Sequence, residues 1–397
     1  MHLQWLKPLL GRPAPFTTVY VDATPIDVGA EQEVAERWKG LRRSIHAADR
    51  VSAAVLDEIG DRLAVPDGRR APHGRVIVAD AHGVVVDRLL SAPPPASRVD
   101  VGATPALLPV IRAAEESVRL LIAALDRTGA DLTRVTTGER DHSPATTTVD
   151  GGHDDVHKTR EGALSRRTQT RAEDSWQRNA ETVAHALEKA VADDAPDLVV
   201  LTGDLRTVTL VKDAVTSPVR DRVVEVPGGG RGEGVREGVF KARVSEVAAG
   251  FRARRRRSVL DRFAEALGRG EGGVSGLADV VEVLRRGQVA ELLLDAEALD
   301  GPLGARELWV GTAALELASG AGDLDGLAVS APLRRMTAPI ALVRAALGQD
   351  AGITVAEEGE VTLADGVGAL LRWSDDSTPG GTLLSQSADT GRLRSLG

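Results

Sequence analysis

One polar stretch of the chain, residues 139–171, is crowded with side chains that could do chemistry. It reads ERDHSPATTTVDGGHDDVHKTREGALSRRTQTR and shows no sustained hydrophobic period. Within it, the pair Gly151 and Gly152 precedes His153. Glycine accepts unusual dihedral angles and adds no bulk, so this pair suits a tip whose backbone approaches another molecule closely. An ordinary solvated turn is the alternative.

The same stretch also contains residues of the types that bind metals. They follow the two glycines directly and are His153, Asp154, Asp155 and His157. Imidazole and carboxylate groups are metal ligands, but the stretch lacks the rigid scaffold and the supporting hydrogen bonds that such sites need. We therefore expect no metal and no cofactor.

Basic residues form two groups that could bind phosphates. The first group consists of Lys158, Arg160, Arg166, Arg167 and Arg171. Its alternative role is a solvated face paired with Glu161, Glu173 and Asp174, where exposed ion pairs contribute little. The second group consists of Arg252, Arg254, Arg255, Arg256 and Arg257. These arginines exceed the acidic residues nearby and repel one another on one helix, so phosphate binding would relieve the repulsion. A salt-bridge site between domains is the alternative for this group.

A helix is predicted directly after the polar stretch, starting near Ala172. One helical face carries its apolar residues, Trp176, Ala180, Val183, Ala184, Leu187 and Val191. Before this helix, residues 138–171 are predicted to form one long loop. A loop of that length inside a compact domain is generally functional or disordered. We interpret this one as functional.

Alternating strands and helices predict an α/β protein of three domains. The first domain, 1–112, contains a strand at 17–25, helices at 31–48 and 51–65, and a hairpin at 74–90 that turns at His82 and Gly83. The second, 113–247, contains the loop, a strand pair that turns at Thr128 and Gly129, and the buried strand DLVVLTGD at 197–204. The third, 248–375, contains a helix through 251–270, a helix and strand in 276–299, and further elements in 353–373. The polar tail, 376–397, is expected to be disordered.

A glycine-rich segment, GGGRGEG at 228–234, lies between a strand at 221–226 and the long helix. That is the setting of a dinucleotide-binding turn. However, no downstream strand ends in an acidic residue, and no Gly-Lys-Ser/Thr sequence is present. We therefore expect a mobile surface loop and no nucleotide site.

Composition narrows the functional classes further. The absence of cysteine excludes disulfides, a cysteine nucleophile and thiolate metal sites. A net charge of −9 argues against a general nucleic-acid coat protein, although local basic groups still decide phosphate contacts. Aromatic residues make up 3% of the chain, so base stacking is not expected as the main mode of recognition. No stretch is apolar for long enough to span a bilayer, and we expect a cytoplasmic protein without a membrane partner.

The third domain resembles the C-terminal domain of archaeal and eukaryotic class-1 release factors and of Pelota. The resemblance rests on FAEALGRGEGGVSGLADVVEVLRRGQVAELLLDAEAL (263–299), in which the family's positions are held by Gly276, Val280, Val283, Leu284, Gly287 and Val289. GVGALLRW (366–373) resembles the glycine-rich last strand of that domain. The second domain matches the same proteins in its order of elements. The first looks like that of their bacterial relatives, among them the actinobacterial group of Balon-type ribosome hibernation factors.

The resemblance assigns a role to the glycine pair. In release factors the long loop carries a Gly-Gly-Gln tip that enters the ribosomal peptidyl transferase centre and promotes peptidyl-tRNA hydrolysis. The corresponding residues here are Gly151, Gly152 and His153. The missing glutamine argues against hydrolysis, because that reaction depends on the positioning of a water molecule and of a tetrahedral oxyanion.

The resemblance therefore implies an RNase H-like central domain, a Pelota-like C-terminal domain and a ribosome hibernation or stress factor that is not an enzyme. Such a factor would bind the 70S ribosome at its A site, with its loop toward the peptidyl transferase centre and elongation factor Tu as a possible delivery partner. Ribosomal RNA would be contacted by the glycine pair, His153 and the two basic groups. The alternatives are a peptidyl-tRNA hydrolase or rescue factor that uses His153, and a non-ribosomal interaction protein with a disordered loop.

Overall fold

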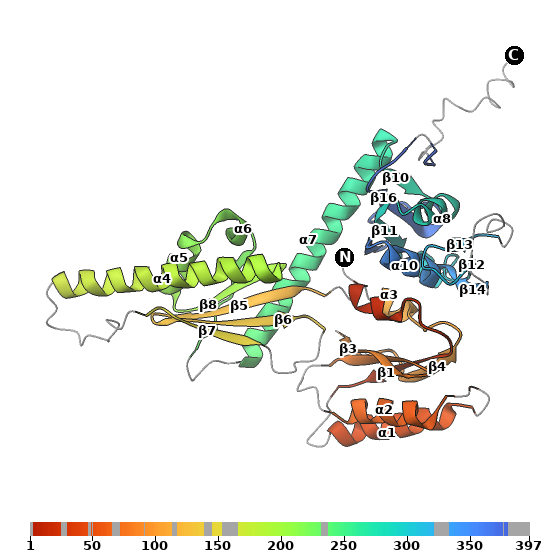
Figure 1. Cartoon of the computed structure of the whole chain (residues 1–397), viewed down its shortest axis with the longest axis horizontal. Coiled ribbons are helices and arrows are strands. Elements are labelled where there is room, and N and C mark those ends of the chain that lie inside the picture. Colours follow the sequence, from red (N-terminus) through yellow and green to blue (C-terminus); the bar gives the residue numbers. More distant parts are fainter. Residues whose placement is uncertain are drawn as a thin grey trace, which may run out of the picture. The chain divides into compact units, whose positions relative to one another are not determined.

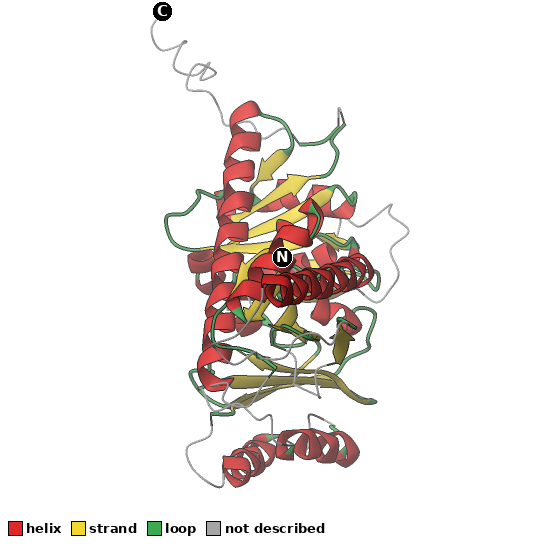
Figure 2. Ribbon diagram, turned by 90° about the vertical axis from the view of Figure 1, so that its left-hand side faces the viewer, coloured by secondary structure: helices red, strands yellow, loops and turns green. Residues whose placement is uncertain are grey.

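The computed structural model describes residues 3–24, 30–46, 49, 51–65, 72–90, 92–112, 117–138, 145–152, 166–231, 237–320, 333–375 and 377–379 (Figures 1 and 2). The chain divides into two compact units. A central unit contains Ser117–Ala253, and a terminal unit contains Met1–Glu116 together with Arg254–Gly397. Several separate sheets with helices on their faces confirm the predicted α/β class.

The central unit is built on a five-stranded sheet in the order β7-β6-β5-β8-β9. Its strands are β5 (Arg119–Asp126), β6 (Gly129–Thr136), β7 (Thr146–Asp150), β8 (Leu198–Gly203) and β9 (Val223–Glu225). β5, β6 and β7 pair antiparallel, whereas β8 is parallel to both β5 and β9. The strand pair with its turn before Gly129 and the buried strand at 197–204 are thus confirmed.

Helices cover both faces of this central sheet because its strands are apolar on both sides. Alternate residues of β5 divide between two cores: Leu121 packs with Val183 and Leu187 of α4 (Arg166–Asp194), whereas Leu120 packs with Val244 of α7 (Glu237–Arg269). The short helices α5 (Leu205–Ala214) and α6 (Ser217–Arg220) lie on the α4 side. The helical face predicted from Trp176 onward is therefore the face that packs on the sheet.

The predicted loop 138–171 is wrong as a single loop. Residues Thr146–Asp150 form strand β7, and α4 begins at Arg166 instead of near Ala172. The run Thr-Thr-Thr-Val is β-branched and suits a strand. Because β7 is an edge strand whose residues are exposed or half-buried, it shows no hydrophobic alternation. The first turns of α4 are polar, so an apolar period cannot reveal them, although Arg, Gln, Ala and Glu favour helix.

The N-terminal part of the terminal unit is an antiparallel sheet in the order β3-β2-β1-β4. Its strands are β1 (Phe16–Asp22), β2 (Gly74–Asp80), β3 (Gly83–Leu90) and β4 (Arg98–Gly102), which confirms the predicted hairpin. Helices α1 (Ala30–Ser44) and α2 (Ala53–Ala64) lie side by side against one face (Figures 1 and 2). The short helices η1 (Leu3–Leu9) and α3 (Leu108–Arg112) belong to the core on the other side.

The C-terminal part of the terminal unit has two sheets, in the orders β10-β16-β11-β15 and β13-β12-β14. The strands are β10 (Gly273–Ser275), β11 (Val289–Asp295), β12 (Glu307–Val310), β13 (Leu317–Ala318), β14 (Arg334–Thr337), β15 (Gly352–Ala356) and β16 (Val367–Leu371). The helices are α8 (Leu277–Arg285), α9 (Ala296–Asp300), α10 (Ala338–Gly348) and the short η4 (Ala364–Gly366).

One hydrophobic core joins η1 to α8 and α10 within the terminal unit. The division into domains 1–112, 113–247 and 248–375 stays a prediction about folding units. The tail expected at 376–397 lies mostly outside the described residues. Residues 377–379 are described, however, and two of them have partners: Ser377 Oγ accepts a hydrogen bond from Arg286 at 2.7 Å, and Thr378 Oγ1 accepts one from Gln288 at 2.8 Å.

Candidate functional site

The base of the predicted tip lies at the end of β7, in the central unit. Gly151 and Gly152 follow this strand directly. His153, Lys158 and Arg160 lie outside the described residues. Arg166, Arg167 and Arg171 fall in the first turns of α4, where the structure describes the backbone but not the side chains.

Gly151 is held against the β5–β6 turn and against α4. Its amide donates a hydrogen bond to the carbonyl of Thr128 at 2.8 Å. Asn179 of α4 donates from Nδ2 to the carbonyl of Arg127 at 2.9 Å and packs directly over Gly151. A Cβ on Gly151 would lie 2.3 Å from Cγ of Asn179, a distance that packed atoms do not reach. The base of the tip therefore requires glycine at position 151.

Gly152 is constrained by its backbone instead. Its φ angle is +73°, in the left-handed region that favours glycine, and no atom lies within 4 Å of where a Cβ would be. Its amide donates to Oδ1 of Asp150 at 3.0 Å. The two glycines are therefore needed for different reasons: one for a close contact, the other for a change of chain direction.

An ion-pair network fixes the neighbouring β5–β6 turn. Asp126 accepts hydrogen bonds from the amides of Thr128 at 2.8 Å and Gly129 at 3.0 Å. Arg231 donates to Asp126 at 2.9 Å and lies 3.3 Å from Asp131. Burial by itself would raise the pKa of Asp126, but the hydrogen bonds of Thr128, the charge of Arg231 and the Gly129 amide outweigh it and lower that pKa.

Arg231 comes from the glycine-rich segment that was expected to be a mobile loop. The described part of this segment is tied down, because the Gly229 amide donates to Oγ1 of Thr202 at 3.0 Å and Arg231 binds the β5–β6 turn. The expectation of mobility is therefore wrong for residues 228–231, and 232–236 lie outside the described part. Long-range partners such as Asp126 leave no local signal in the sequence.

Two guanidinium groups lie over the ring of Trp176 of α4. The Cζ atoms of Arg127 and Arg206 lie 4.6 and 4.7 Å from the centroid of its ring. Such cation–π contacts hold an arginine over the ring face. Trp176, interpreted from the sequence as a core anchor, is thus half-buried and also organises charge beside the β5–β6 turn.

The second basic group lies on α7, and its members have different surroundings. Arg256 is half-buried and donates to Glu357 at 3.2 Å, and its Nη2 lies 3.3 Å from Glu360. Arg254 and Arg257 are exposed, one turn apart, and neither forms an ion pair with any described residue. Arg252 and Arg255 are half-buried. Arg254 and Arg257 are therefore the members best placed to meet a phosphate.

Among the described residues, no cluster of three or more His, Asp or Glu side chains has the geometry of a metal site. The four residues considered as ligands, His153, Asp154, Asp155 and His157, lie outside that part of the chain. No helix among the described residues is both long and apolar enough to cross a membrane.

The model of bacterial archaeo-eukaryotic release factor family 2 matches residues 119–269. This segment is release-factor-like. The match begins at β5, includes the glycine base, and continues to the end of α7. It confirms the predicted resemblance to bacterial relatives of the archaeal and eukaryotic release factors.

Relatives of similar length exist in Mycobacterium tuberculosis. Uncharacterized protein MT2704 of strain CDC 1551 and uncharacterized protein Rv2629 of strain H37Rv are each 28% identical to this chain over 393 residues. The alignment covers 94% of this chain and 97% of each relative. The similarity therefore extends well beyond the release-factor-like segment 119–269.

Solved structures are similar at lower identity. Pelota of Archaeoglobus fulgidus is 16% identical, with 77% of this chain and 81% of that chain covered and a TM-score of 0.34. Dom34 of S. cerevisiae, a translation termination-like factor, is 12% identical, with 65% of each chain covered and a TM-score of 0.35. A model of ribosome-bound archaeal Pelota and ABCE1 contains a chain 14% identical, with 93% of each covered and a TM-score of 0.39.

Sequence reasoning found the glycine pair and the α7 arginines but missed the residues that hold them. Asn179, Arg127 and Arg231 were not predicted as part of the site. Only Arg127 had a local signal in the sequence. It precedes the predicted turn at Thr128 and Gly129, and side chains beside a turn lie at an end of the sheet.

Proposed function

We propose that this protein is a ribosome hibernation or stress factor that binds the A site of the bacterial ribosome without hydrolysing peptidyl-tRNA. The segment that begins after Gly152 would extend toward the peptidyl transferase centre. The observation that carries the proposal is the match of residues 119–269 to a release-factor family, in a segment with two glycines where release factors have a Gly-Gly-Gln tip.

The geometry of the glycine base supports a presented tip. Gly151 is locked between the β5–β6 turn and Asn179, and Gly152 then turns the chain with a positive φ angle. A rigid base lowers the entropy that a segment loses when it binds a partner. A segment that only connected β7 to α4 would not need a glycine at a position where Asn179 leaves no room for a Cβ atom.

Charge supports contact with ribosomal RNA at one defined surface. The whole chain carries a net charge of −9, so RNA is repelled on average and only local groups can bind it. Arg254 and Arg257 are exposed cations without ion-pair partners among the described residues. Salt screens the repulsion between RNA and acidic residues that lie more than about 8 to 10 Å away. Lys158, Arg160, Arg166, Arg167 and Arg171 are proposed to add phosphate contacts beside the tip.

The residue after the two glycines, His153, favours a factor that occupies the peptidyl transferase centre without hydrolysing peptidyl-tRNA. His153 stands where release factors have glutamine, and a hydrolytic tip must position water against a developing oxyanion. Delivery by elongation factor Tu and a cytoplasmic location are parts of the same proposal, and both rest on the resemblance to Pelota.

Co-sedimentation with 70S ribosomes tests the proposal. Arg254→Glu with Arg257→Glu should weaken binding at least tenfold and lower the slope of log affinity against log salt by about two. The matched control is Lys39→Glu with Arg43→Glu on α1, which makes the same charge change at two other exposed helical positions. Equal effects of the two double variants, or no effect of either, would contradict a specific RNA surface.

The alternative is a peptidyl-tRNA hydrolase or rescue factor that acts through Gly151, Gly152 and His153. Release of labelled peptide from stalled ribosomes separates the two functions. We expect no release above the background without protein, and no change in release for His153→Ala. Release that is abolished by His153→Ala would establish the hydrolase instead.

A further inference from the structure

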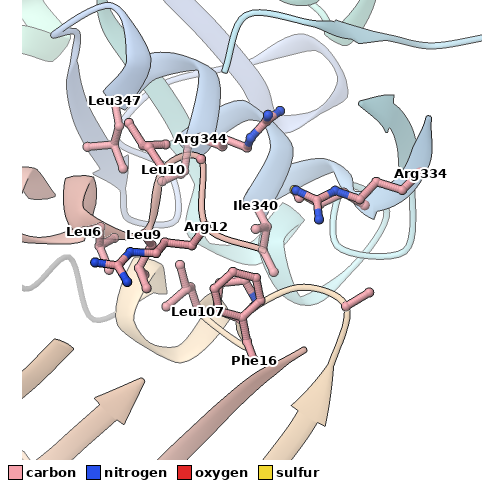
Figure 3. A pocket seen from close by; sticks show the side chains of 15 residues that line it. Leu6, Leu9, Leu10, Arg12, Phe16, Leu107, Arg334, Ile340, Arg344 and Leu347 are labelled. Atoms are coloured by element: carbon pink, nitrogen blue, oxygen red, sulfur yellow. The ribbon is translucent and has the colours of Figure 1, made fainter. Parts of the chain in front are cut away.

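A small pocket in the terminal unit has an apolar floor and arginines at its edge (Figure 3). The space inside it, with its open mouth included, is about 480 Å³. The floor is formed by side chains from η1, β1, the segment before α3, and α10, namely Leu6, Leu9, Phe16, Leu107, Ile340 and Leu347. Figure 3 shows the guanidinium of Arg334 extending from β14 toward Ile340. Pockets of this kind, apolar with a few polar groups, are typical of small-molecule sites.

Arg344 of α10 is a buried cation that forms no ion pair with a described carboxylate. Its residue is 9% exposed, and Nη2 donates to the carbonyls of Gly311 at 2.9 Å, Thr312 at 2.6 Å and Ala313 at 2.8 Å. Nη1 is buried and has no hydrogen-bond partner. Burial and, to a smaller extent, the positive charge of Arg334 lower the pKa of Arg344 to about 10, although the negative charge of Glu316 acts in the opposite direction.

Arg334 adds a second cation without a counterion at the same pocket. It is half-buried on β14, and its side chain forms no ion pair or hydrogen bond with the described residues. Arg12, the third arginine, differs because it binds the buried carboxylate of Asp80 at 3.0 Å. Arg334 and Arg344 therefore line the pocket without an ion-pair partner among the described residues, and Glu316 offsets only part of the charge of Arg344.

Two like charges beside an apolar floor are unfavourable without an anion. A buried charge is costly unless it is paired, and like charges near each other repel. We propose that this pocket binds a small carboxylic acid with a short aliphatic chain, with the carboxylate on Arg334 and Arg344 and the chain on the apolar floor. The planar guanidinium matches a carboxylate in geometry. The floor offers no hydroxyl or amide side chain that would recognise a sugar.

This site is independent of the proposed ribosomal function, because none of its residues lies in the release-factor-like segment 119–269. Loss of ribosome binding would leave the pocket unchanged, and an empty pocket would not affect the ribosomal proposal.

Isothermal titration of the full-length protein with octanoate tests the site. Octanoate should bind one-to-one below its micelle concentration, whereas acetate, which lacks the chain, and octylamine, which has the opposite charge, should bind at least tenfold more weakly. Arg334→Gln should weaken octanoate binding about tenfold, the size expected for the loss of one charge-assisted hydrogen bond. The Arg334 side chain forms no hydrogen bond or ion pair with the described residues and its backbone pairing is unchanged, so this variant should fold.

The neighbouring residue supplies the matched control. Arg335 is exposed, follows Arg334 on the same strand and is bound to Glu307 at 2.6 Å, so its side chain leaves from the opposite face of β14. Arg335→Gln should leave octanoate binding within twofold of the unchanged protein. The proposal is overturned if octanoate does not bind, if 1-octanol binds as tightly as octanoate, or if Arg334→Gln and Arg335→Gln have equal effects.

Discussion

Two groups of arginines, one at the base of the tip and one on α7, have different partners. At the base, Arg127 lies over Trp176 and Arg231 binds Asp126 and Asp131. On α7, only Arg256 among the three members Arg254, Arg256 and Arg257 is bound to described carboxylates. Arginines with several partners stabilise the backbone around them, whereas exposed arginines without partners can bind an anionic group of another molecule. The number of partners thus separates a structural from a recognition role.

The largest effect on stability is expected for substitutions of the two glycines at the base of the tip. Gly151→Ala would place a Cβ 2.3 Å from Asn179, and such overpacking should lower the free energy of unfolding of the central unit by about 2 kcal/mol. Gly152→Ala meets no atom within 4 Å and should cost only about 1 kcal/mol for its left-handed backbone. Hydrogen exchange of the β6–β7 peptides across a urea series measures both. Equal protection in the two variants would show that the Asn179 contact does not constrain the base.

The Arg231 network should have the next largest effect. Arg231 is 19% exposed and touches two carboxylates, so Arg231→Gln should lower the free energy of unfolding by about 1 to 2 kcal/mol near neutral pH. The pKa of Asp126 is lowered from 3.8 on folding, so this carboxylate stabilises the fold above pH 3.8 and the stability is lost as the pH falls below it.

The pH dependence of the free energy of unfolding shows whether Arg231 acts through Asp126. Without Arg231, the pKa of Asp126 should be lowered less, so the variant should lose less stability than the unchanged protein between pH 5 and about 3. Urea unfolding at a series of pH values measures this difference. Parallel curves for the two proteins would mean that Arg231 does not act through Asp126.

The sequence predicted those elements whose signal is local. The β5–β6 turn was found because Thr128 and Gly129 separate two apolar strands, and the packed face of α4 because its residues recur with a helical period. β7 was missed because its exposed Thr residues do not alternate with apolar ones. Asn179 and Arg231 were missed because their partners lie 52 and 105 residues away. Likewise, nothing near Arg256 indicates Glu357, 101 residues further along the chain.

On α7, single substitutions of neighbouring arginines test the difference between paired and unpaired members. Arg256→Gln should lower the free energy of unfolding by about 1 kcal/mol, because it removes a half-buried arginine from two carboxylates. Arg254 is exposed, so Arg254→Gln should change the free energy of unfolding by less than about 0.5 kcal/mol while weakening ribosome binding. Thermal unfolding and ribosome co-sedimentation should therefore rank these two variants in opposite orders. The same order in both measurements would contradict the division of α7 into paired and available arginines.

The smallest expected effect concerns the stack on Trp176. Arg127→Gln removes one of the two guanidinium groups over the ring and should lower the free energy of unfolding by about 0.5 kcal/mol, the size of a cation–π contact at an exposed site. Arg178→Gln, an exposed position two residues beyond Trp176 on α4, is the matched control and should change stability less. Because Arg127 also supplies the carbonyl that Asn179 binds, its backbone role survives the substitution. A loss as large as that of Gly151→Ala would therefore mean that the guanidinium itself, and not only the backbone of the turn, fixes the base of the tip.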